Sequence, residues 1–376
     1  MTTILTVTEP RDSHAVYVDA VLTATGHESH LIVVDPILRD GGFSLATDAE
    51  SEWLQVRSQH ERLPLDSIDT QWNRRRLTHP FEPRSYHPAD LPFLEGSAFA
   101  FARSVSLLSE DGFAVNPARG ILRGGDKFAQ LRAAKAVGLR VPDTLIGNDH
   151  EEVLAFLAAR KAICTKTHFN ANWKTEEGII SAFTTVIRAP EELPQDAVEL
   201  SPTIYQEYIS KAFEVRITIF GNYVAASKIL VPEDPDLASD WRQNLSYLNT
   251  LQAFSVEDWL LTKLKQIMSL LDIRFGTFDL AMSREGEWVF FEVNEAGQFI
   301  WQELHSEDTM VLEPFARYLA SKDDQFTFDP RTCSAELSAK ALRSRFDSLP
   351  KSAFMKALGP IPSAAMNVLD ERASAA

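Results

Sequence analysis

Residues 275–294 constrain the fold most strongly, because their pattern predicts a β-hairpin with acidic side chains on one face. The residues alternate with the period of two that is typical of half-buried strands. A symmetric reversal at Glu285 and Gly286 places Asp279 directly opposite Glu292. One face is then predicted to carry Phe278, Leu280, Met282, Val289, Phe291 and Val293, and the other Thr277, Asp279, Ala281, Phe290, Glu292 and Asn294.

The two carboxylates that face each other in this hairpin suggest a metal site. Their Cβ atoms would lie about 5 Å apart, where like charges repel, and a bound cation would remove the conflict. Asn294 points to the same side as Glu292 and offers a third oxygen. Oxygen ligands suit Mg²⁺, which keeps waters and bridges substrate phosphates. The alternative is a solvent-facing hairpin with two screened carboxylates, and the hairpin alone favours neither.

Length and composition bound the class of protein. A chain of 376 residues is long enough for two or three domains. Its formal net charge of −16 argues against a nucleic-acid partner. No apolar run reaches the roughly 20 residues of a membrane span, and the N-terminus lacks a signal-peptide pattern. With Cys164 and Cys333 as the only cysteines, no disulfide framework is expected, so we expect a cytoplasmic protein without a membrane partner.

The first third of the chain has the pattern of a small α/β unit. Gly26 is placed to end the first helix, and the turn-rich residues 116–120 mark a boundary. Strands are expected at residues 4–8 and 31–34, and helices at residues 13–25 and 90–108.

The remainder is predicted to mix strands and helices. Gly221 and Asn222 predict a tight hairpin turn, whereas the polar residues 168–178 predict a mobile loop and residues 232–246 a charged loop. Past Glu303 the chain is predicted to be helical. Strands are expected at residues 162–166, 203–209, 213–220 and 223–231, helices at residues 126–138 and 258–271, helix breaks at Pro314, Pro330 and Pro350, and disorder at the C-terminus.

Three lysines are candidates for holding phosphate groups. Lys127 lies in the first turn of a predicted helix, where the helix dipole disfavours a cation. Lys166 ends an apolar strand, and Lys228 lies inside a strand. Lysines that converge on one cleft hold a polyphosphate as point charges. The alternative for each lysine taken singly is an ordinary surface position.

Other polar residues are candidates for binding a nucleotide. Glu214 and Arg216 share one face of a strand, where Glu214 could accept both hydroxyls of a ribose or form a weak salt bridge with Arg216. Arg242 and Asn244 follow a loop and could close over a reacting phosphate. An adenine-binding edge, made by backbone groups and the Glu207 carboxylate, is predicted at Gln206, Glu207, Tyr208 and Ile209.

A basic cluster, Arg74 to Arg76, stands out in this acidic chain. One interpretation is a solvated loop. The other is a local binding site for an acidic ligand, because the planar guanidinium group pairs with a carboxylate through two hydrogen bonds.

Taken in order, these elements resemble the ATP-grasp ligases from about residue 116 to residue 303. The resemblance is carried by Asn116-Pro117, Asp126-Lys127, Gly138-Leu139-x-Val141-Pro142-x-Thr144, Lys166, Gln206 to Ile209, Glu214-x-Arg216, Arg242-x-Asn244, Asp279 and Glu292-x-Asn294. It implies a mixed α/β and α+β protein. The implied parts are an N-terminal pre-ATP-grasp α/β domain at residues 1–117, a central ATP-grasp subdomain at 118–205, a C-terminal subdomain with the Mg²⁺ and ATP site at 206–322, and a helical extension with a disordered tail at 323–376.

A narrower resemblance points to the peptide-maturing branch that makes microviridin-type graspetides. It is carried by Gly297-Gln298-Phe299-x-Trp301 after Glu292-Val293-Asn294, and by Trp72-Asn73-Arg74-Arg75. Two positions depart from the pattern. Glu295 stands where a proline is expected, and the loop after Lys166 has no glycine before Gly178, so Lys174 or His168 could replace a backbone phosphate cradle.

The resemblance implies roles for the candidate residues. ATP and two Mg²⁺ ions are implied, with a ribosomally made precursor peptide as the partner and a homodimer as one form of assembly. The implied nucleotide-binding residues are Lys127, Lys166, Gln206, Glu207, Tyr208, Ile209, Glu214 and Lys228. The implied metal ligands are Asp279, Glu292 and Asn294, the catalytic residues Arg216, Arg242 and Asn244, and the peptide-binding residues Arg74 and Arg75.

The activity implied is ATP-dependent ligation of a peptide. Side-chain carboxylates would be activated as acyl-phosphates and joined to Ser, Thr or Lys side chains as esters or amides. One alternative is an amino-acid ligase that extends the C-terminus of a peptide or protein. Another is a nucleotide-binding regulator without catalysis, although a regulator does not need all three metal ligands.

Overall fold

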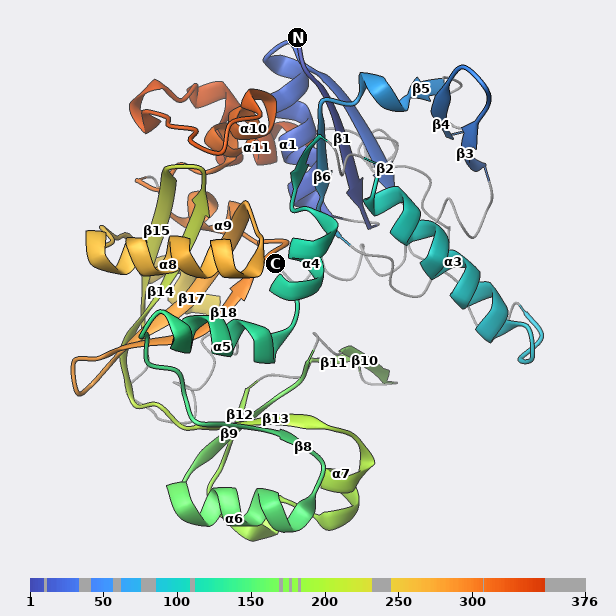
Figure 1. Cartoon of the computed structure of the whole chain (residues 1–376). Coiled ribbons are helices and arrows are strands. Elements are labelled where there is room, and N and C mark those ends of the chain that lie inside the picture. The colour runs from blue at the N-terminus through green and yellow to red at the C-terminus, as the bar shows by residue number, and fades with distance from the viewer. Residues whose placement is uncertain are drawn as a thin grey trace.

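The computed structural model describes residues 1–9, 12–33, 42–56, 62–75, 86–108, 112–168, 172–175, 178–181, 184–231, 245–306 and 308–348. Figure 1 shows an N-terminal unit at the top beside the C-terminal helices, a larger sheet in the middle and a smaller sheet with two helices at the bottom. This mixed α/β architecture agrees with the fold class predicted from the sequence.

The N-terminal unit is a parallel sheet with the order β2-β1-β6-β7. The predicted β-α-β opening is confirmed. Helix α1 begins after Asp12, whose side chain accepts a hydrogen bond from the backbone N–H of His14, and it ends before Gly26, which has a φ of +82°. The elements are β1 (Thr3–Thr8), α1 (Ser13–Ala24), β2 (Glu28–Val33), β6 (Thr70–Asn73) and β7 (Phe113–Val115).

A second small sheet, which the sequence did not predict, lies beside this unit. Its strands are short, and in the longest regular alternation only Leu54 and Val56 of β4 are buried. Leu54 and Val56 pack with Ala98 and Val105 of α3, the helix expected at residues 90–108. The elements are β3 (Phe43–Thr47), β4 (Glu52–Val56), β5 (Arg62–Pro64) and α3 (Leu91–Ser106).

The central unit is an antiparallel sheet with the order β12-β9-β13-β8, covered by two helices (Figure 1). Asp126 caps α5 by accepting a hydrogen bond from the Ala129 N–H at 2.6 Å, as predicted. The elements from the boundary onward are α4 (Ala118–Gly124), α5 (Lys127–Ala136), β8 (Thr144–Gly147), α6 (His150–Arg160), β9 (Ile163–Lys166), β12 (Thr185–Ile187), α7 (Gln195–Leu200) and β13 (Thr203–Glu207).

The polar stretch after β9 contains a hairpin of β10 (Asn172–Thr175) and β11 (Gly178–Ser181), which pair antiparallel. The prediction of a loop over residues 168–178 is therefore wrong for these strands. Polar residues dominate β10, so it lacks the apolar alternation that identifies a strand in a sequence.

The C-terminal unit is a five-stranded sheet with the order β16-β15-β14-β17-β18. The predicted turn at Gly221 is confirmed, and α8 has the predicted bounds and covers one face of the sheet with an apolar stripe. The elements are β14 (Lys211–Phe220), β15 (Tyr223–Leu230), β16 (Gln252–Ala253), α8 (Asp258–Leu271), β17 (Phe275–Ser283) and β18 (Trp288–Asn294).

The acidic hairpin has the predicted register at its open end, where Asp279 pairs with Glu292. A β-bulge then shifts the register, so that Leu280 pairs with Phe290. The extra residue reverses the predicted faces of three side chains, and the first of these, Val289, pairs with Ala281. Phe290 is fully buried in the core, whereas Phe291 lies on the same side as Glu292. The predicted alternation is therefore wrong at residues 289–291.

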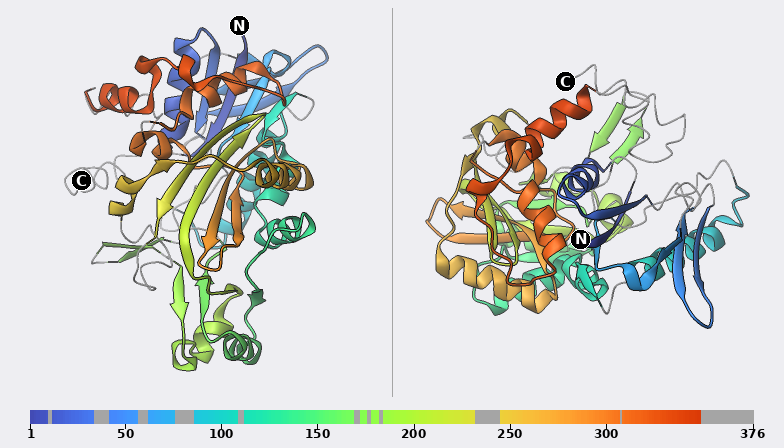
Figure 2. Two further views of the ribbon diagram at one scale, coloured as in Figure 1. Left: turned by 90° about the vertical axis from the view of Figure 1, so that its left-hand side faces the viewer. Right: turned by 90° about the horizontal axis from the view of Figure 1, so that it is seen from above.

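The C-terminal helices join the first unit to the large sheet. Figure 2 shows them beside the N-terminal helix, and a cluster of large aromatic side chains fills the junction. The members include Trp72, Phe220, Phe275, Phe299, Phe315 and Tyr318. The helices are α9 (Ile300–His305), α10 (Leu312–Ser321) and α11 (Ala339–Asp347).

Pro314 does not break the helical region, contrary to the prediction. It lies in the first turn of α10, where a proline is tolerated because its missing N–H has no partner within the helix. Pro330 starts a short 3₁₀ turn, and Pro350 and the predicted C-terminal tail lie outside the described residues. Among the described helices, none has the length and apolar character that crossing a membrane requires.

Candidate active site

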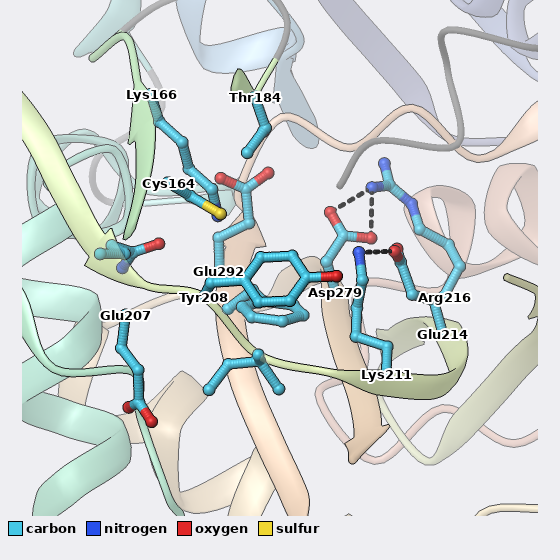
Figure 3. A pocket seen from close by; sticks show the side chains of 13 residues that line it. Cys164, Lys166, Thr184, Glu207, Tyr208, Lys211, Glu214, Arg216, Asp279 and Glu292 are labelled. Carbon is cyan, nitrogen blue, oxygen red and sulfur yellow. Dashed lines mark hydrogen bonds and ion pairs between the residues drawn. The ribbon is translucent and has the colours of Figure 1, made fainter. Parts of the chain in front are cut away.

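A pocket lies between the central sheet and the C-terminal sheet. In Figure 3, Cys164 and Lys166 from β9 lie on one side of the pocket, and Lys211, Glu214 and Arg216 from β14 lie on the other, beside Asp279. Glu292 lies between the two groups. Many of these side chains are polar or charged. The lining consists of Cys164, Lys166, Thr184, Gln206, Glu207, Tyr208, Ile209, Lys211, Glu214, Arg216, Asp279, Phe291 and Glu292.

Each carboxylate of the facing pair has its own basic partner. Arg216 Nη1 lies 2.7 and 2.6 Å from the two carboxylate oxygens of Asp279, and Lys127 Nζ lies 2.6 Å from Glu292 Oε2. Asn294 Nδ2 donates to both carboxylates at 3.2 Å. The repulsion from which the sequence analysis inferred a cation is thus already balanced by side chains of the protein.

Lys127 reaches Glu292 because α5 is docked on β18. Gln130, one turn further along α5, donates to the Val293 carbonyl at 2.8 Å and accepts from the Val293 N–H at 3.0 Å. Residues three apart on a helix lie on the same face. The two hydrogen bonds of the buried Gln130 therefore direct Lys127 towards the neighbouring Glu292.

The two carboxylates have pKa values shifted in opposite directions. Burial raises the pKa of Asp279 above its ordinary value, and Glu292 adds to this while Arg216 opposes it. Burial also acts to raise the pKa of Glu292, but the charges of Lys127 and Lys166 and the amide of Asn294 outweigh it, so this pKa lies below its ordinary value. Glu292 is therefore the more firmly ionised member of the pair.

The donor set fits Mg²⁺. Asp279, Glu292 and Asn294 offer carboxylate and amide oxygens, and Mg²⁺ uses few protein ligands and completes its shell with water and phosphate oxygens. Asn294 presents its nitrogen to the carboxylates here, so rotation of the amide by half a turn would present its oxygen to a cation. In the part of the chain that the structure describes, no group of three His, Cys, Asp or Glu side chains is placed to hold a metal.

Two lysines flank Phe291 inside the pocket. Lys166 Nζ lies 4.9 Å and Lys211 Nζ 5.7 Å from the centre of the ring. Lys211 also pairs with Glu214. Burial lowers the pKa of Lys166, and the nearby Glu292 carboxylate opposes the shift. The buried Lys211 and the half-buried Lys166 place an ammonium group on each side of the pocket, which suits an anionic ligand such as a phosphate chain.

Comparisons with known proteins identify the fold. No protein-family model matches the sequence, and no curated protein matches it. Solved structures do. The Chryseobacterium gregarium RiPP-associated ATP-grasp ligase, in complex with ADP and a leader and core peptide, matches with a TM-score of 0.73 and 20% identity over 85% of this chain and 96% of that chain. The macrocyclase MdnC from Microcystis aeruginosa, bound with precursor peptide MdnA, matches with a TM-score of 0.71 and 22% identity over 86% and 100%.

The chain has the ATP-grasp fold. The ligase PsnB, complexed with a phosphomimetic variant of a minimal precursor, Mg and ADP, supports this with a TM-score of 0.65 and 18% identity over 86% of this chain and 99% of that chain. The resemblance inferred from residues 116–303 is thereby confirmed at the level of the fold, and it extends to the N-terminal unit.

The predicted adenine edge lies at and just after the end of β13 in the ATP-grasp fold, and four of its polar groups have partners within the protein. Glu207 contacts Arg140 at 3.1 Å, and Figure 3 shows its side chain pointing away from Asp279 and Glu292. Gln206 donates to Thr144 Oγ1 at 3.0 Å. The backbone N–H groups of Glu207 and Tyr208 donate to the carbonyls of residues 143 and 162.

Lys228 is not brought together with the other candidates. It pairs with Val215 in the sheet, whereas Ser227 pairs with Arg216. Because neighbouring residues on a strand point to opposite faces, Lys228 lies on the face away from the pocket, with Nζ 4.1 Å from the centre of the Phe213 ring. Arg242 and Asn244 lie outside the described residues.

The two described arginines of the basic cluster differ. Arg74 is fully buried: its Nε lies 3.1 Å from an oxygen of Asp12, and its Nη1 donates to the Ala296 carbonyl at 2.9 Å. Burial lowers the pKa of Arg74 to about 10, and Asp12 opposes the shift. Arg75 is partly exposed and lies 3.3 Å from Glu9 beside a cavity. The prediction that Arg74 holds a peptide carboxylate does not agree with its enclosed position, and Arg76 is outside the described residues.

Sequence reasoning missed Lys211. Lys211 and Glu214 are three positions apart, and in a regular strand residues an odd number of positions apart point to opposite faces. A second bulge, between Lys211 and Phe213, brings both to the pocket. The signal available in the sequence was a lysine at the start of the strand that carries Glu214 and Arg216.

Proposed function

We propose that the chain is an ATP-dependent ligase that joins side-chain carboxylates of a ribosomal precursor peptide to Ser, Thr or Lys side chains. One observation carries the proposal: Lys166, Lys211 and Arg216 meet the pair of Asp279 and Glu292 in one pocket of an ATP-grasp fold. Such a pocket combines cations for phosphate groups with oxygen ligands for Mg²⁺.

The residues are assigned by their chemistry. Lys166 and Lys127 hold phosphate oxygens, Glu214 accepts the ribose hydroxyls, and residues 206–209 contact adenine. Two Mg²⁺ ions held by Asp279, Glu292 and Asn294 would neutralise charge on the phosphate chain. The structure of PsnB complexed with Mg and ADP supports Mg²⁺ and a nucleotide as what the pocket binds.

The reaction has two steps. A carboxylate oxygen of the peptide bonds to the γ-phosphorus of ATP, and the bond to ADP breaks, which leaves an acyl-phosphate. A hydroxyl or amine of the same peptide then bonds to the acyl carbon, loses its proton, and releases phosphate. Phosphoryl transfer needs positioning and charge neutralisation above all. Arg216, held against Asp279, lies where it can stabilise both the acyl intermediate and the leaving phosphate.

The peptide substrate is supported by the neighbours and by the first unit. Two of the similar structures contain a leader and core peptide or a precursor peptide. Arg75, which borders a cavity that Glu9 and Glu295 also line, would meet an acidic side chain of the peptide. We include in the proposal a cytoplasmic location, without membrane or nucleic-acid partners.

Mass spectrometry of a reaction with ATP, Mg²⁺ and an acidic precursor peptide tests the proposal. A product lighter by one water per linkage marks a macrocyclase. A product heavier by one residue, in a reaction that includes free amino acids, marks an amino-acid ligase instead. ATP binding without peptide-dependent turnover marks a regulator. Unchanged peptide together with absent ATP binding would contradict all three.

A further inference from the structure

Residues 295–300 connect the last metal-ligand candidate, Asn294, to α9, and four side chains hold their backbone. Asn116, which follows β7, donates to the Glu295 carbonyl at 2.7 Å. Arg74 donates to the Ala296 carbonyl at 2.9 Å. Arg216 donates to the Gln298 carbonyl at 3.0 Å. His14 Nε2 lies 3.0 Å from the backbone N of Phe299 and 3.2 Å from that of Ile300. Three of the four side chains, those of Asn116, Arg74 and His14, come from the N-terminal unit or its end, so the segment links that unit to the pocket.

His14 accepts both of these hydrogen bonds, so its Nε2 carries no proton. The ring lies 5.2 Å from the Phe299 ring in an edge-on arrangement, and its side chain is 13% exposed. Two backbone donors at the start of α9 thus depend on a single acceptor from α1.

Arg74 and His14 share a buried anchor in Asp12. This carboxylate accepts from the His14 backbone N–H and from Thr8 Oγ1, and it pairs with the Arg74 guanidinium. The positions of the two side chains over residues 295–300 are therefore set together at the end of β1.

The other end of the segment contacts the metal-ligand candidates directly. Arg216 bridges the Gln298 carbonyl and the Asp279 carboxylate, and Asn294 touches both Asp279 and Glu292. The backbone between them has little room to adjust. Gly297 has a φ of +62°, and a Cβ atom there would lie 2.3 Å from the Phe275 ring.

We propose that His14 and Arg74 are positioning residues for the metal site. They fix the backbone of residues 295–300, and thereby hold Arg216 and Asn294 in the orientation that presents Asp279 and Glu292 to Mg²⁺. The inference rests on the proposed function, because it assumes that these carboxylates bind Mg²⁺ with a nucleotide. Groups that orient metal ligands affect metal affinity without contacting the ion.

The test compares ADP binding in EDTA with ADP binding in excess Mg²⁺ by calorimetry, for the full-length protein. The ratio of the two affinities gives the Mg²⁺ enhancement. His14→Phe keeps the ring but removes the acceptor, and we expect its enhancement to fall roughly tenfold while its affinity in EDTA stays at the wild-type value. His14→Gln places an oxygen near the position of Nε2 and should restore the enhancement.

Thr70→Val is the matched control. Thr70 is fully buried at the opposite end of the strand that leads to Arg74, and its hydroxyl donates to the Leu319 carbonyl at 2.8 Å. This variant should melt at a lower temperature and keep the wild-type Mg²⁺ enhancement.

Wild-type Mg²⁺ enhancement in His14→Phe would overturn the inference, since His14 would then serve only stability. If His14→Phe does not fold, Arg74→Lys decides, because lysine can keep the charge near Asp12 but cannot also reproduce the guanidinium contact with Ala296. A reduced enhancement in Arg74→Lys supports the inference, and an unchanged one rejects it. A wild-type protein that binds ADP without any Mg²⁺ enhancement would instead contradict the proposed function.

Discussion

Lys127 Nζ lies 2.6 Å from Glu292 Oε2, although 165 positions separate the two residues in the chain. The contact ties α5, the helix that precedes the central sheet, to the acidic hairpin of the C-terminal sheet. A cation bound to the Glu292 carboxylate would compete with Lys127 for its negative charge. The Lys127 ammonium would then be freer to contact a phosphate.

Glu292→Gln should abolish ligation and lower the stability of the ligand-free protein. Glu292 is held ionised by Lys127 and Lys166, and loss of a hydrogen bond to a charged group costs about 1.5–3 kcal/mol. Asp279→Asn should also abolish ligation but destabilise less, because burial already disfavours the Asp279 charge. Product formation and melting temperature of both variants give the comparison. Full activity in either variant would remove that residue from the metal site.

Lys166→Ala should weaken ATP binding roughly ten- to hundredfold, because a charge-assisted contact contributes about 1.5–3 kcal/mol. Lys228→Met is the matched control. Lys228 lies on the opposite face of the C-terminal sheet, over Phe213, and methionine keeps the apolar part of that packing. Calorimetry should show wild-type ATP affinity for Lys228→Met. Equal losses in the two variants would contradict the placement of the phosphate chain beside Lys166.

Arg74→Ala and Arg75→Ala should have different effects. Breaking the buried pair of Arg74 with Asp12 leaves an unpaired buried charge, which costs about 3–5 kcal/mol, so Arg74→Ala should lower the denaturation midpoint strongly. Arg75→Ala should leave stability nearly unchanged and raise the KM for peptide. Its turnover at saturating peptide should stay normal. A wild-type KM for peptide in Arg75→Ala would place the peptide-binding site elsewhere.

Stability should decrease in mild acid because of His14. Burial, and then the charges of Arg74, Arg75 and Arg216, lower the pKa of His14 well below its ordinary value of 6.5, while Asp12 lies 3.7 Å from its Nδ1. The unfolded chain therefore binds this proton more readily than the folded protein. The free energy of unfolding that comes from keeping His14 neutral is fully present above the ordinary pKa of 6.5. It is lost as the pH falls from there towards the lower pKa of the folded protein.

Urea denaturation at several pH values measures this loss. In His14→Gln, which cannot take up the proton, the dependence on pH between neutrality and mild acid should flatten. An unchanged slope would assign the acid sensitivity to other groups.

The pairing of Asp279 with Glu292 could be predicted from the sequence because a symmetric hairpin needs only the position of its turn. The same arithmetic applied to Gly221 and Asn222 places Lys228 opposite Val215 and away from Arg216, so the structure's placement of Lys228 was available from the sequence. The two bulges could not be predicted from the sequence, because an extra residue in one strand is recognised only when its pairing with the neighbouring strand is known. Phe291 and Lys211 were missed for that reason.

The burial of Arg74 was beyond sequence reasoning for a different cause. Its partners Asp12 and Ala296 are remote in the chain, so nothing near Arg74 distinguishes it from the more exposed Arg75. The order of motifs was sufficient for the ATP-grasp fold, which depends on local patterns of strands and helices. The roles of individual site residues depend on contacts between units and remain predictions.

The aromatic cluster around Phe220 and Phe315 has a consequence for motion. It fuses the N-terminal unit and the C-terminal sheet into one body, while the central unit has a separate core that includes Val153 and Tyr205. We therefore expect a nucleotide to enter by a swing of the central unit about its two connections, at residues 142–143 and 208–210. Tyr208 and Ile209 of the second connection line the pocket. The residues expected to contact the nucleotide are therefore also expected to act as the hinge.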